Sequence, residues 1–346
     1  MDLKVLSLGG AEDLVSTGIA LVVVSGLFNG LFTAPMKLEH RWKWENIWFI
    51  FILIACLVMP ATLVFSITSP WWNVLTQTPR YAVVAALSFG FAWGFGAICF
   101  GKSVHSLGVS LANTLVIGLS AALGSLVPLL MTFQIHLGRK DLALFAGVIA
   151  LLLGVAVCGK AGRIRDGEEQ TGGTAPLAGY LLAVAAGVMS AIFNIGYTLA
   201  LPISDEGVRV GLSRFAATNL IWLLMLGAGS LPNIAYCVLL MQRNHTAYLL
   251  HVRDCWSSWA RSGAMGLLWG GSIFLYGAAT PRLGPLGPSV GWPLSLAVGL
   301  VVANLVGVLL GEWRSAPRPS IKLMWFGLTI LLFAIVLCGM STRFPE

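Results

Sequence analysis

The sequence predicts an all-α integral membrane protein with ten transmembrane helices, arranged as two inverted repeats of five helices each. Composition is the first observation behind this prediction. Of the 346 residues, 57% are hydrophobic and 10% are charged, whereas soluble domains carry about 25% charged residues. The mean hydropathy is +0.85. The other two observations are long apolar runs and a pattern shared by the two halves of the chain.

Each apolar run is about 20 residues long, enough for an α-helix to cross roughly 30 Å of hydrocarbon. The runs are continuously apolar and do not alternate every second residue, which favours helices over barrel strands. Acidic residues precede the first run, where a secretory signal would be basic, so we predict that this run is a span. The ten runs are 16–36, 47–67, 81–101, 109–132, 142–160, 176–201, 212–241, 260–280, 289–311 and 322–340.

The two halves of the chain repeat the same landmarks in the same order. Trp93-Gly94 recurs as Trp269-Gly270, and Phe100-Gly101 recurs as Tyr276-Gly277 at the same spacing. Such a duplication in an apolar chain is typical of transporters built from structural repeats. Further matches, at slightly different spacings, are Ser25, Phe28 and Asn29 with Ser190, Phe193 and Asn194, and Gly147, Cys158 and Gly159 with Gly327, Cys338 and Gly339.

The polar stretch between the fifth and sixth runs predicts the boundary between the repeats. We place the first five-helix repeat at 1–160, a polar cytoplasmic linker at 161–175 and the second five-helix repeat at 176–346. A repeat with five spans ends on the opposite side of the membrane from where it began. The second copy must therefore enter from the other face, which makes the two repeats inverted.

The net charge of +7 could suggest a nucleic-acid partner, but the 21 lysines and arginines lie mainly in short loops between the runs. Lysine and arginine in short loops set membrane orientation, because they are enriched on the cytoplasmic side. Thirteen of them fall in loops on one side and eight on the other. We therefore predict that both termini lie outside.

Several functional classes lack their motifs in this sequence. A membrane-embedded enzyme would need a cluster such as His-Glu-x-x-His, paired intramembrane aspartates or a Gly-x-Ser-x-Gly turn, and the sequence contains none. It has no P-loop to use ATP, and its six cysteines follow no metal-binding or disulfide spacing. We therefore expect a protein without enzymatic activity, cofactor or metal.

Three stretches together resemble the L-rhamnose–proton symporter family, within the drug/metabolite transporter superfamily, and the likeness runs the length of the chain. The resemblance implies a bacterial inner-membrane transporter of inverted five-helix repeats. It would move a small, rhamnose-like neutral sugar with protons by alternating access. The stretches are Phe32-Thr33-Ala34-Pro35-Met36-Lys37 with Trp42-Lys43-Trp44-Glu45; Phe89-Gly90-Phe91-Ala92-Trp93-Gly94 with Gly101 and Leu107-Gly108; and Gly266-Leu267-Leu268-Trp269 with Tyr276-Gly277, Trp292 and Gly311-Glu312-Trp313.

The sequence departs from the family pattern at two places. In that pattern a glutamine follows the eighth-span tryptophan, and an acidic residue opens the ninth span. Here those neighbourhoods are Trp269-Gly270-Gly271-Ser272 and Gly287-Pro288-Ser289. The identity of the sugar and of the proton carrier therefore stays open. Export of a metabolite or drug-like substrate, as in other branches of the superfamily, is the alternative transporter hypothesis.

A neutral sugar needs amides or hydroxyls for its hydroxyl groups and aromatic rings for its C–H faces. Asn29 and Asn194 stand at equivalent places in the two repeats, as do Trp93 and Trp269. We predict that these four contact the substrate, and the alternative is that they only hold helices together. Weaker candidates for substrate binding are Asn113, Ser272, Tyr276 and Trp292.

The apolar runs contain no acidic residue at depth, although a buried titratable group is the usual proton carrier. His105 is a candidate because histidine titrates near neutral pH. The alternative is a histidine on a surface loop. Further candidates for proton coupling or gating are Asp205, Glu206 and Glu312, near the ends of runs.

Overall fold

The computed structural model describes residues 3–69, 71–107, 109–131, 138–167, 177–285 and 287–342. Its description of side chains begins at residue 13 and leaves out 101, 104, 105, 109–111 and 166. The described part contains helices and no strand. Its long helices are α1 (Leu3–Leu31), α6 (Arg80–Leu107), α7 (Val109–Met131), α8 (Arg139–Asp166), α9 (Leu177–Arg209), α10 (Arg214–Arg243), α11 (Trp256–Ala279), α12 (Gly287–Leu309) and α13 (Arg318–Ser341).

The second apolar run forms a helix with three consecutive parts. A π-helical turn separates two α-helical segments, and Pro60 lies at the start of the second. Proline has no N–H to donate to the preceding turn, and π-turns are common where an α-helix is locally disturbed. The parts are α3 (Trp44–Ile52), η1 (Leu53–Val58) and α4 (Met59–Ile67). The remaining short helices are α2 (Ala34–Lys37), α5 (Trp71–Gln77), η3 (Ala247–His251) and η4 (Thr280–Leu283).

Nine helical segments of the described part are long and apolar enough to cross a membrane. The helix that corresponds to the predicted eighth span, α11, is not among them, although it has 24 residues. Its first two turns carry Arg261 and three serines, which lower its hydropathy. Length and composition therefore support nine of the ten predicted spans.

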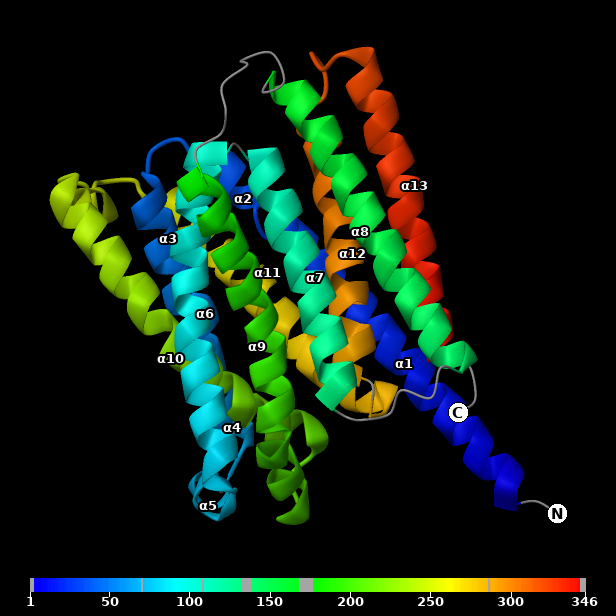
Figure 1. The fold of residues 1–346 in the computed structure, drawn as a ribbon. Coiled ribbons are helices and arrows are strands. Elements are labelled where there is room, and N and C mark those ends of the chain that lie inside the picture. Colours follow the sequence, from blue (N-terminus) through cyan, green and yellow to red (C-terminus); the bar gives the residue numbers. More distant parts are fainter. Residues whose placement is uncertain are drawn as a thin grey trace.

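With the α3–η1–α4 series counted as one helix, successive long helices run in alternating directions through the bundle (Figure 1). We call the end where α6 finishes and α9 begins the upper end. The lower end is where α9 finishes and α10 begins. The first long helix rises from the lower end, and α13 returns to it, so α1 begins and α13 finishes at the same end of the bundle.

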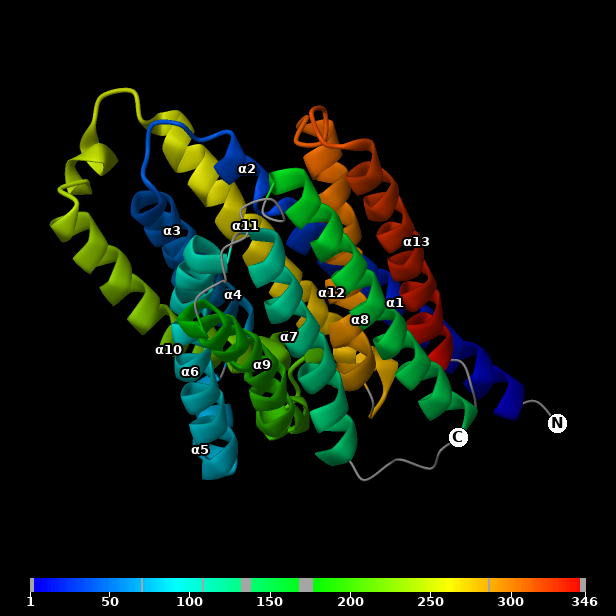
Figure 2. The ribbon, with the colours of Figure 1, turned by 45° about the horizontal axis from the view of Figure 1, so that its top comes forward.

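The helices α8 and α13 occupy the same place in the two halves, and they pack against each other through reciprocal contacts. A side chain added at Gly147 would lie 2.6 Å from the sulfur of Cys338, and one added at Gly327 would lie 2.6 Å from the sulfur of Cys158. Gly147 is near the start of α8 and Cys338 near the end of α13, so the two helices are antiparallel, as Figures 1 and 2 show.

Other helices that correspond to each other in the two halves also make corresponding contacts with the opposite half. In the first half α6 packs on α9, and the equivalent helix of the second half, α11, packs on α1. Likewise α7 packs on α9, and its equivalent α12 packs on α1. Helices α6 and α7 of the first half thus pack on α9 of the second half, and helices α11 and α12 of the second half pack on α1 of the first.

The predicted linker is partly helical. The helix α8 continues to Asp166 and ends at Gly167, which adopts the left-handed conformation (φ 73°) common at helix ends. The first residues of the predicted 161–175 linker therefore extend α8. The remainder, from 168 onward, lies outside the described residues.

Candidate functional site

A cavity of ≈ 210 Å³ lies between the two halves. Its lining residues lie on or next to α1, α3, α6, α7, α9, α11 and α12. The cavity is therefore formed by helices from both halves of the chain. Its lining contains no Asp, Glu, Lys, Arg or His among the described residues. The lining residues are Ser25, Asn29, Phe32, Trp48, Phe51, Ile52, Trp93, Gly96, Ala97, Phe100, Val116, Ala186, Ser190, Phe193, Trp269, Ser272, Ile273, Tyr276, Trp292, Ser295 and Leu296.

Two repeat-related tryptophans meet at this cavity. The rings of Trp93 and Trp269 stack with centroids 5.3 Å apart and planes 14° apart. Phe193 packs on Trp93 at 5.0 Å, and Phe51 packs edge-on against Trp269 at 5.8 Å. The result is an apolar, aromatic surface that suits the C–H face of a small ring.

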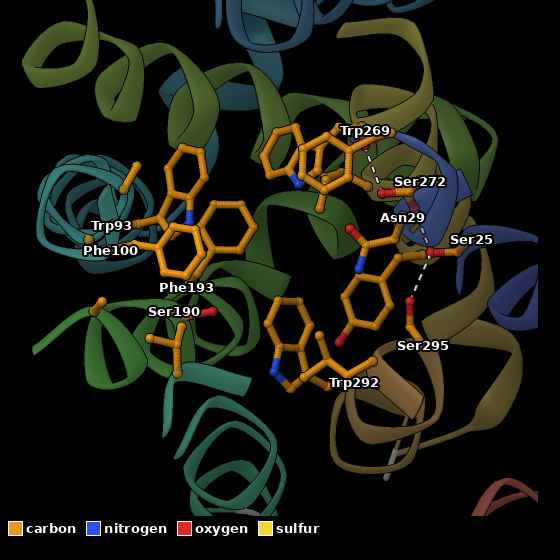
Figure 3. A pocket seen from close by; sticks show the side chains of 18 of the residues that line it. Ser25, Asn29, Trp93, Phe100, Ser190, Phe193, Trp269, Ser272, Trp292 and Ser295 are labelled. Carbon is orange, nitrogen blue, oxygen red and sulfur yellow. Dashed lines mark hydrogen bonds between the residues drawn. The ribbon is translucent and has the colours of Figure 1, made fainter. Parts of the chain in front are cut away.

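The side-chain amide of Asn29 lines the cavity and makes no hydrogen bond to another described residue. It is half-buried on α1, and its side chain points toward the middle of the cavity in Figure 3. The described part of the chain offers this amide no hydrogen-bond partner. Its carbonyl and two N–H groups are therefore free for a ligand.

Asn194 has the equivalent place in the second repeat but a different environment. It is fully buried and does not line the cavity. Its Nδ2 donates to the carbonyl oxygens of Gly124 at 2.6 Å and Pro288 at 3.1 Å, and its Oδ1 accepts from the Tyr276 hydroxyl. Asn194 therefore ties α9 to α7, α11 and α12.

Two pairs of serine hydroxyls lie on opposite sides of the cavity. Ser25 Oγ lies 3.2 Å from Ser295 Oγ and donates to the carbonyl oxygen of Ser272 at 2.8 Å. Ser190 Oγ lies 2.8 Å from Ser120 Oγ. Figure 3 shows Ser190 on one side and the Ser25–Ser295 pair on the other.

Four aromatic side chains pack together on the lower-end side of the cavity, and we call them the aromatic plug: Tyr197, Trp222, Tyr276 and Trp292. All four are less than a tenth exposed. Tyr197 stacks on Trp222 with centroids 4.6 Å apart and planes 2° apart. The Tyr197 hydroxyl lies 2.6 Å from the Thr280 hydroxyl, and Trp292 Nε1 donates to the Ser120 carbonyl at 3.1 Å.

The other predicted residues lie elsewhere. Asn113 is half-buried on α7 and does not line the cavity. Asp205 is exposed, with Arg214 at 3.5 Å, and Glu206 pairs with Arg209 at 2.5 Å; both pairs are at the lower end. The side chain of His105 lies outside the described residues.

Glu312 joins three segments at the upper end. It pairs with Lys37 of α2 and lies 3.4 Å from Arg165 of α8, whose guanidinium sits over the Trp313 ring at 4.8 Å. It does not line the cavity. The arrangement links the first repeat to the turn after α12.

Sequence reasoning missed a second carboxylate at this end, Glu39. Its side chain is fully enclosed and accepts hydrogen bonds from Ser258 at 2.9 Å and Arg261 at 3.1 Å, both on α11. Burial alone would raise the pKa of Glu39, but the N–H groups of Arg41 and Trp42 and these two side chains together hold it below its ordinary value. Glu39 thus stays ionised and links the turn after α2 to α11.

Of the four serines that line the cavity, sequence reasoning named Ser272 as a site residue and missed Ser25, Ser190 and Ser295. Ser25 and Ser190 stood out as repeat landmarks, and that equivalence was the available signal. Within the described residues, no group of three or more His, Cys, Asp or Glu side chains could hold a metal ion.

Residues 12–342 match the family model described as L-rhamnose-proton symport protein (RhaT). The chain belongs to this family. The match covers nearly the whole chain, both halves and every helix that lines the cavity. The chain is therefore a transporter rather than an enzyme, and a multi-pass protein of the bacterial inner membrane.

Individual relatives agree with the family model. The L-rhamnose-proton symporter of Citrobacter koseri is 24% identical over 345 residues, which cover 95% of this chain and 99% of the relative. The L-rhamnose-proton symporter of Yersinia pestis is 25% identical over the same shares. A solved crystal structure has the same fold, with a TM-score of 0.61 at 18% identity, over 95% of this chain and 98% of that chain.

Proposed function

We propose that this chain is a secondary active transporter that carries a small neutral monosaccharide across the inner membrane together with protons. The observation that carries the proposal is the uncharged cavity between the two halves, which combines stacked tryptophans with a free amide. Both relatives described above are named for symport of L-rhamnose with protons. At about 25% identity, those names support a sugar better than they support one particular sugar.

The size and chemistry of the cavity favour a sugar over a drug-like substrate. Pockets for drug-sized ligands usually measure about 300–1,000 Å³, and this cavity measures ≈ 210 Å³. A cationic drug would need a counter-charge, because an unpaired charge in a dry site is strongly disfavoured. The described lining provides none.

The transporter consists, in this proposal, of two inverted repeats of five spans, 1–160 and 176–346, with α11 as the tenth span. The reciprocal contacts of Gly147 with Cys338 and of Gly327 with Cys158 support it, because a two-fold exchange between the halves requires such pairs. The Lys and Arg count favours an orientation with the upper end in the cytoplasm and both termini outside.

The proposed transport mechanism is alternating access, and the difference between the two ends of the cavity supports it. Toward the lower end, Tyr197 and Tyr276 lie 5.7 Å apart and are buried in the plug. Their repeat equivalents are Phe32 and Phe100, which are half-buried and line the cavity nearer the upper end. The proposed second state closes Phe32 against Phe100 and separates the two tyrosines.

Coupling to protons is carried by groups outside the described cavity lining. Our candidates are His105, Asp205, Glu206 and Glu312. Asp205 and Glu206 lie at the lower end, and Glu312 lies at the upper end, so each is placed to respond to opening at its own end. Asn29, Trp93, Trp269, Ser272, Tyr276 and Trp292 are the proposed substrate contacts. Asn194 is the proposed positioning residue for Tyr276.

The proposal is tested by uptake into proteoliposomes that contain the purified protein. Uptake of labelled L-rhamnose, other deoxy-sugars and hexoses is measured with and without an imposed pH gradient. We expect saturable uptake of at least one sugar, faster with an inward proton gradient. If none is taken up while lipophilic cations are exported, the sugar proposal is wrong and the exporter alternative is correct.

A further inference from the structure

The two serine pairs of the cavity are equivalent under the internal repeat. Ser190 corresponds to Ser25 at the same spacing that relates Asn194 to Asn29. Ser295 corresponds to Ser120 at nearly the spacing that relates Trp269 to Trp93. Each pair therefore joins the first helix of one repeat to the fourth helix of the other.

The hydrogen bonds of the first pair leave an acceptor toward the cavity. Ser25 has one hydroxyl proton, which it donates to the carbonyl oxygen of Ser272. In the contact between Ser25 and Ser295, the donor must then be Ser295. The Ser295 oxygen keeps lone pairs that a solute hydroxyl can use. The Asn29 amide, which has no hydrogen-bond partner in the described part, lies on the same side of the cavity as Ser25 and Ser295.

The pair of Ser120 and Ser190 has one hydroxyl proton that is free to donate to a solute. Ser120 Oγ accepts from Trp292 Nε1 at 3.2 Å and shares one proton with Ser190 at 2.8 Å. Two hydroxyls carry two protons, so one proton of the pair has no protein acceptor among the described residues. Ser120 is 1% exposed and does not line the cavity, whereas Ser190 is half-buried and does. The free proton is therefore available at Ser190.

We propose that these two pairs are the hydroxyl-recognition points of the transporter, with Ser295 accepting from one hydroxyl of the sugar and Ser190 donating to another. This inference rests on the proposed function and names its specificity-determining residues. A hydroxyl can both donate and accept, so a polyhydroxy solute satisfies both sides, with its ring against the aromatic surface between them (Figure 3).

The test compares the binding of L-rhamnose and of its monodeoxy derivatives, each lacking one hydroxyl. Isothermal titration is carried out on the detergent-purified full chain. We expect Ser190→Ala and Ser295→Ala each to bind L-rhamnose roughly three- to tenfold more weakly, the effect of losing one neutral hydrogen bond. For each variant, one monodeoxy derivative should bind with the same affinity to the variant and to the wild type. That derivative lacks the hydroxyl that the replaced serine contacts, so the substitution costs it nothing.

Ser125→Ala is the matched control. This serine is on α7, as Ser120 is, but its hydroxyl donates to the carbonyl oxygen of Ala121 in its own helix at 2.6 Å. The control should bind every sugar as the wild type does. If Ser190→Ala does not fold, Ser190→Cys replaces it, since a thiol of similar size is only a weak hydrogen-bond donor.

Two results overturn the inference alone: wild-type affinity in both variants, or an equal loss for L-rhamnose and for every derivative. The latter would mean that the serines only support the walls. A wild-type protein that binds neither L-rhamnose nor any other sugar of the uptake panel would overturn the proposed function, and this inference with it. The two failures are therefore distinguishable.

Discussion

The indole rings of Trp93 and Trp269 stack on each other at the cavity, with centroids 5.3 Å apart and planes 14° apart. They come from α6 and α11, which have the same place in the two halves. Each ring comes from a different half of the chain, so both halves contribute to this wall of the cavity. If the halves are inverted repeats, as we propose, the two tryptophans lie at the axis that relates them.

Replacing either tryptophan should impair transport. Trp269→Ala removes an aromatic surface worth about 1.5 kcal/mol, so we expect about tenfold weaker sugar binding, while Trp269→Phe keeps most of it. Uptake into proteoliposomes measures the effect. Trp72→Ala is the control, because Trp72 is 62% exposed and does not line the cavity. Equal loss in Trp72→Ala would contradict the assigned role.

The two equivalent asparagines should respond differently. Asn29→Ala should weaken sugar binding and leave the melting temperature unchanged, because no protein group in the described part depends on its amide. Asn194→Ala should lower the free energy of unfolding by about 1–3 kcal/mol, since it leaves buried groups without partners. Thermal unfolding and sugar titration of both variants give the comparison. Identical profiles would show that the amides share one role.

Removing the plug hydroxyls should favour opening toward the lower end. Tyr197→Phe loses the 2.6 Å contact with Thr280, and Tyr276→Phe loses the bond to Asn194. Each neutral hydrogen bond contributes about 1 kcal/mol, so each change should increase the open population about fivefold. The readout is labelling from the lower end of a cysteine placed at Ala97. Tyr81→Phe, at an exposed position, should have no effect.

Glu39 predicts a dependence of stability on pH. Its pKa in the folded protein is below the ordinary 4.5 that it regains on unfolding. Its ionised form therefore stabilises the fold fully above about pH 4.5, and the contribution is lost as pH falls through the lowered pKa. The melting temperature of Glu39→Gln should lie below that of the wild type near pH 7, and the gap should shrink below pH 4.5. A gap independent of pH would refute this.

Much of the fold could be predicted, because membrane spans need about 20 apolar residues whatever their neighbours are. Within the described residues, each of the ten predicted runs overlaps a long helix or the α3–η1–α4 series over most of its length. The helix α11 shows the limit of this reasoning. Many of its residues are buried by protein rather than by lipid, so its serines and Arg261 are tolerated and its apolarity is weak.

The site could be predicted only in part. The repeat drew attention to Trp93 and Trp269, because rare residues at equivalent places stand out, and both line the cavity; their contact with a substrate stays a prediction. It could not separate Asn29 from Asn194, since their difference lies in which carbonyls surround them. It marked Ser25 and Ser190 only as landmarks, because serine is common, and only the folded chain shows which serines lack a complete set of hydrogen-bond partners.

The central claim is that the cavity between the halves opens to one side at a time and holds the sugar. The most direct measurement labels a single cysteine at Ala97, in a chain without its six native cysteines, with a membrane-impermeant maleimide applied to one side and then the other. We predict fast labelling from the upper-end side only, slowed by saturating sugar. Equal labelling from both sides, or labelling that sugar does not change, would contradict the account.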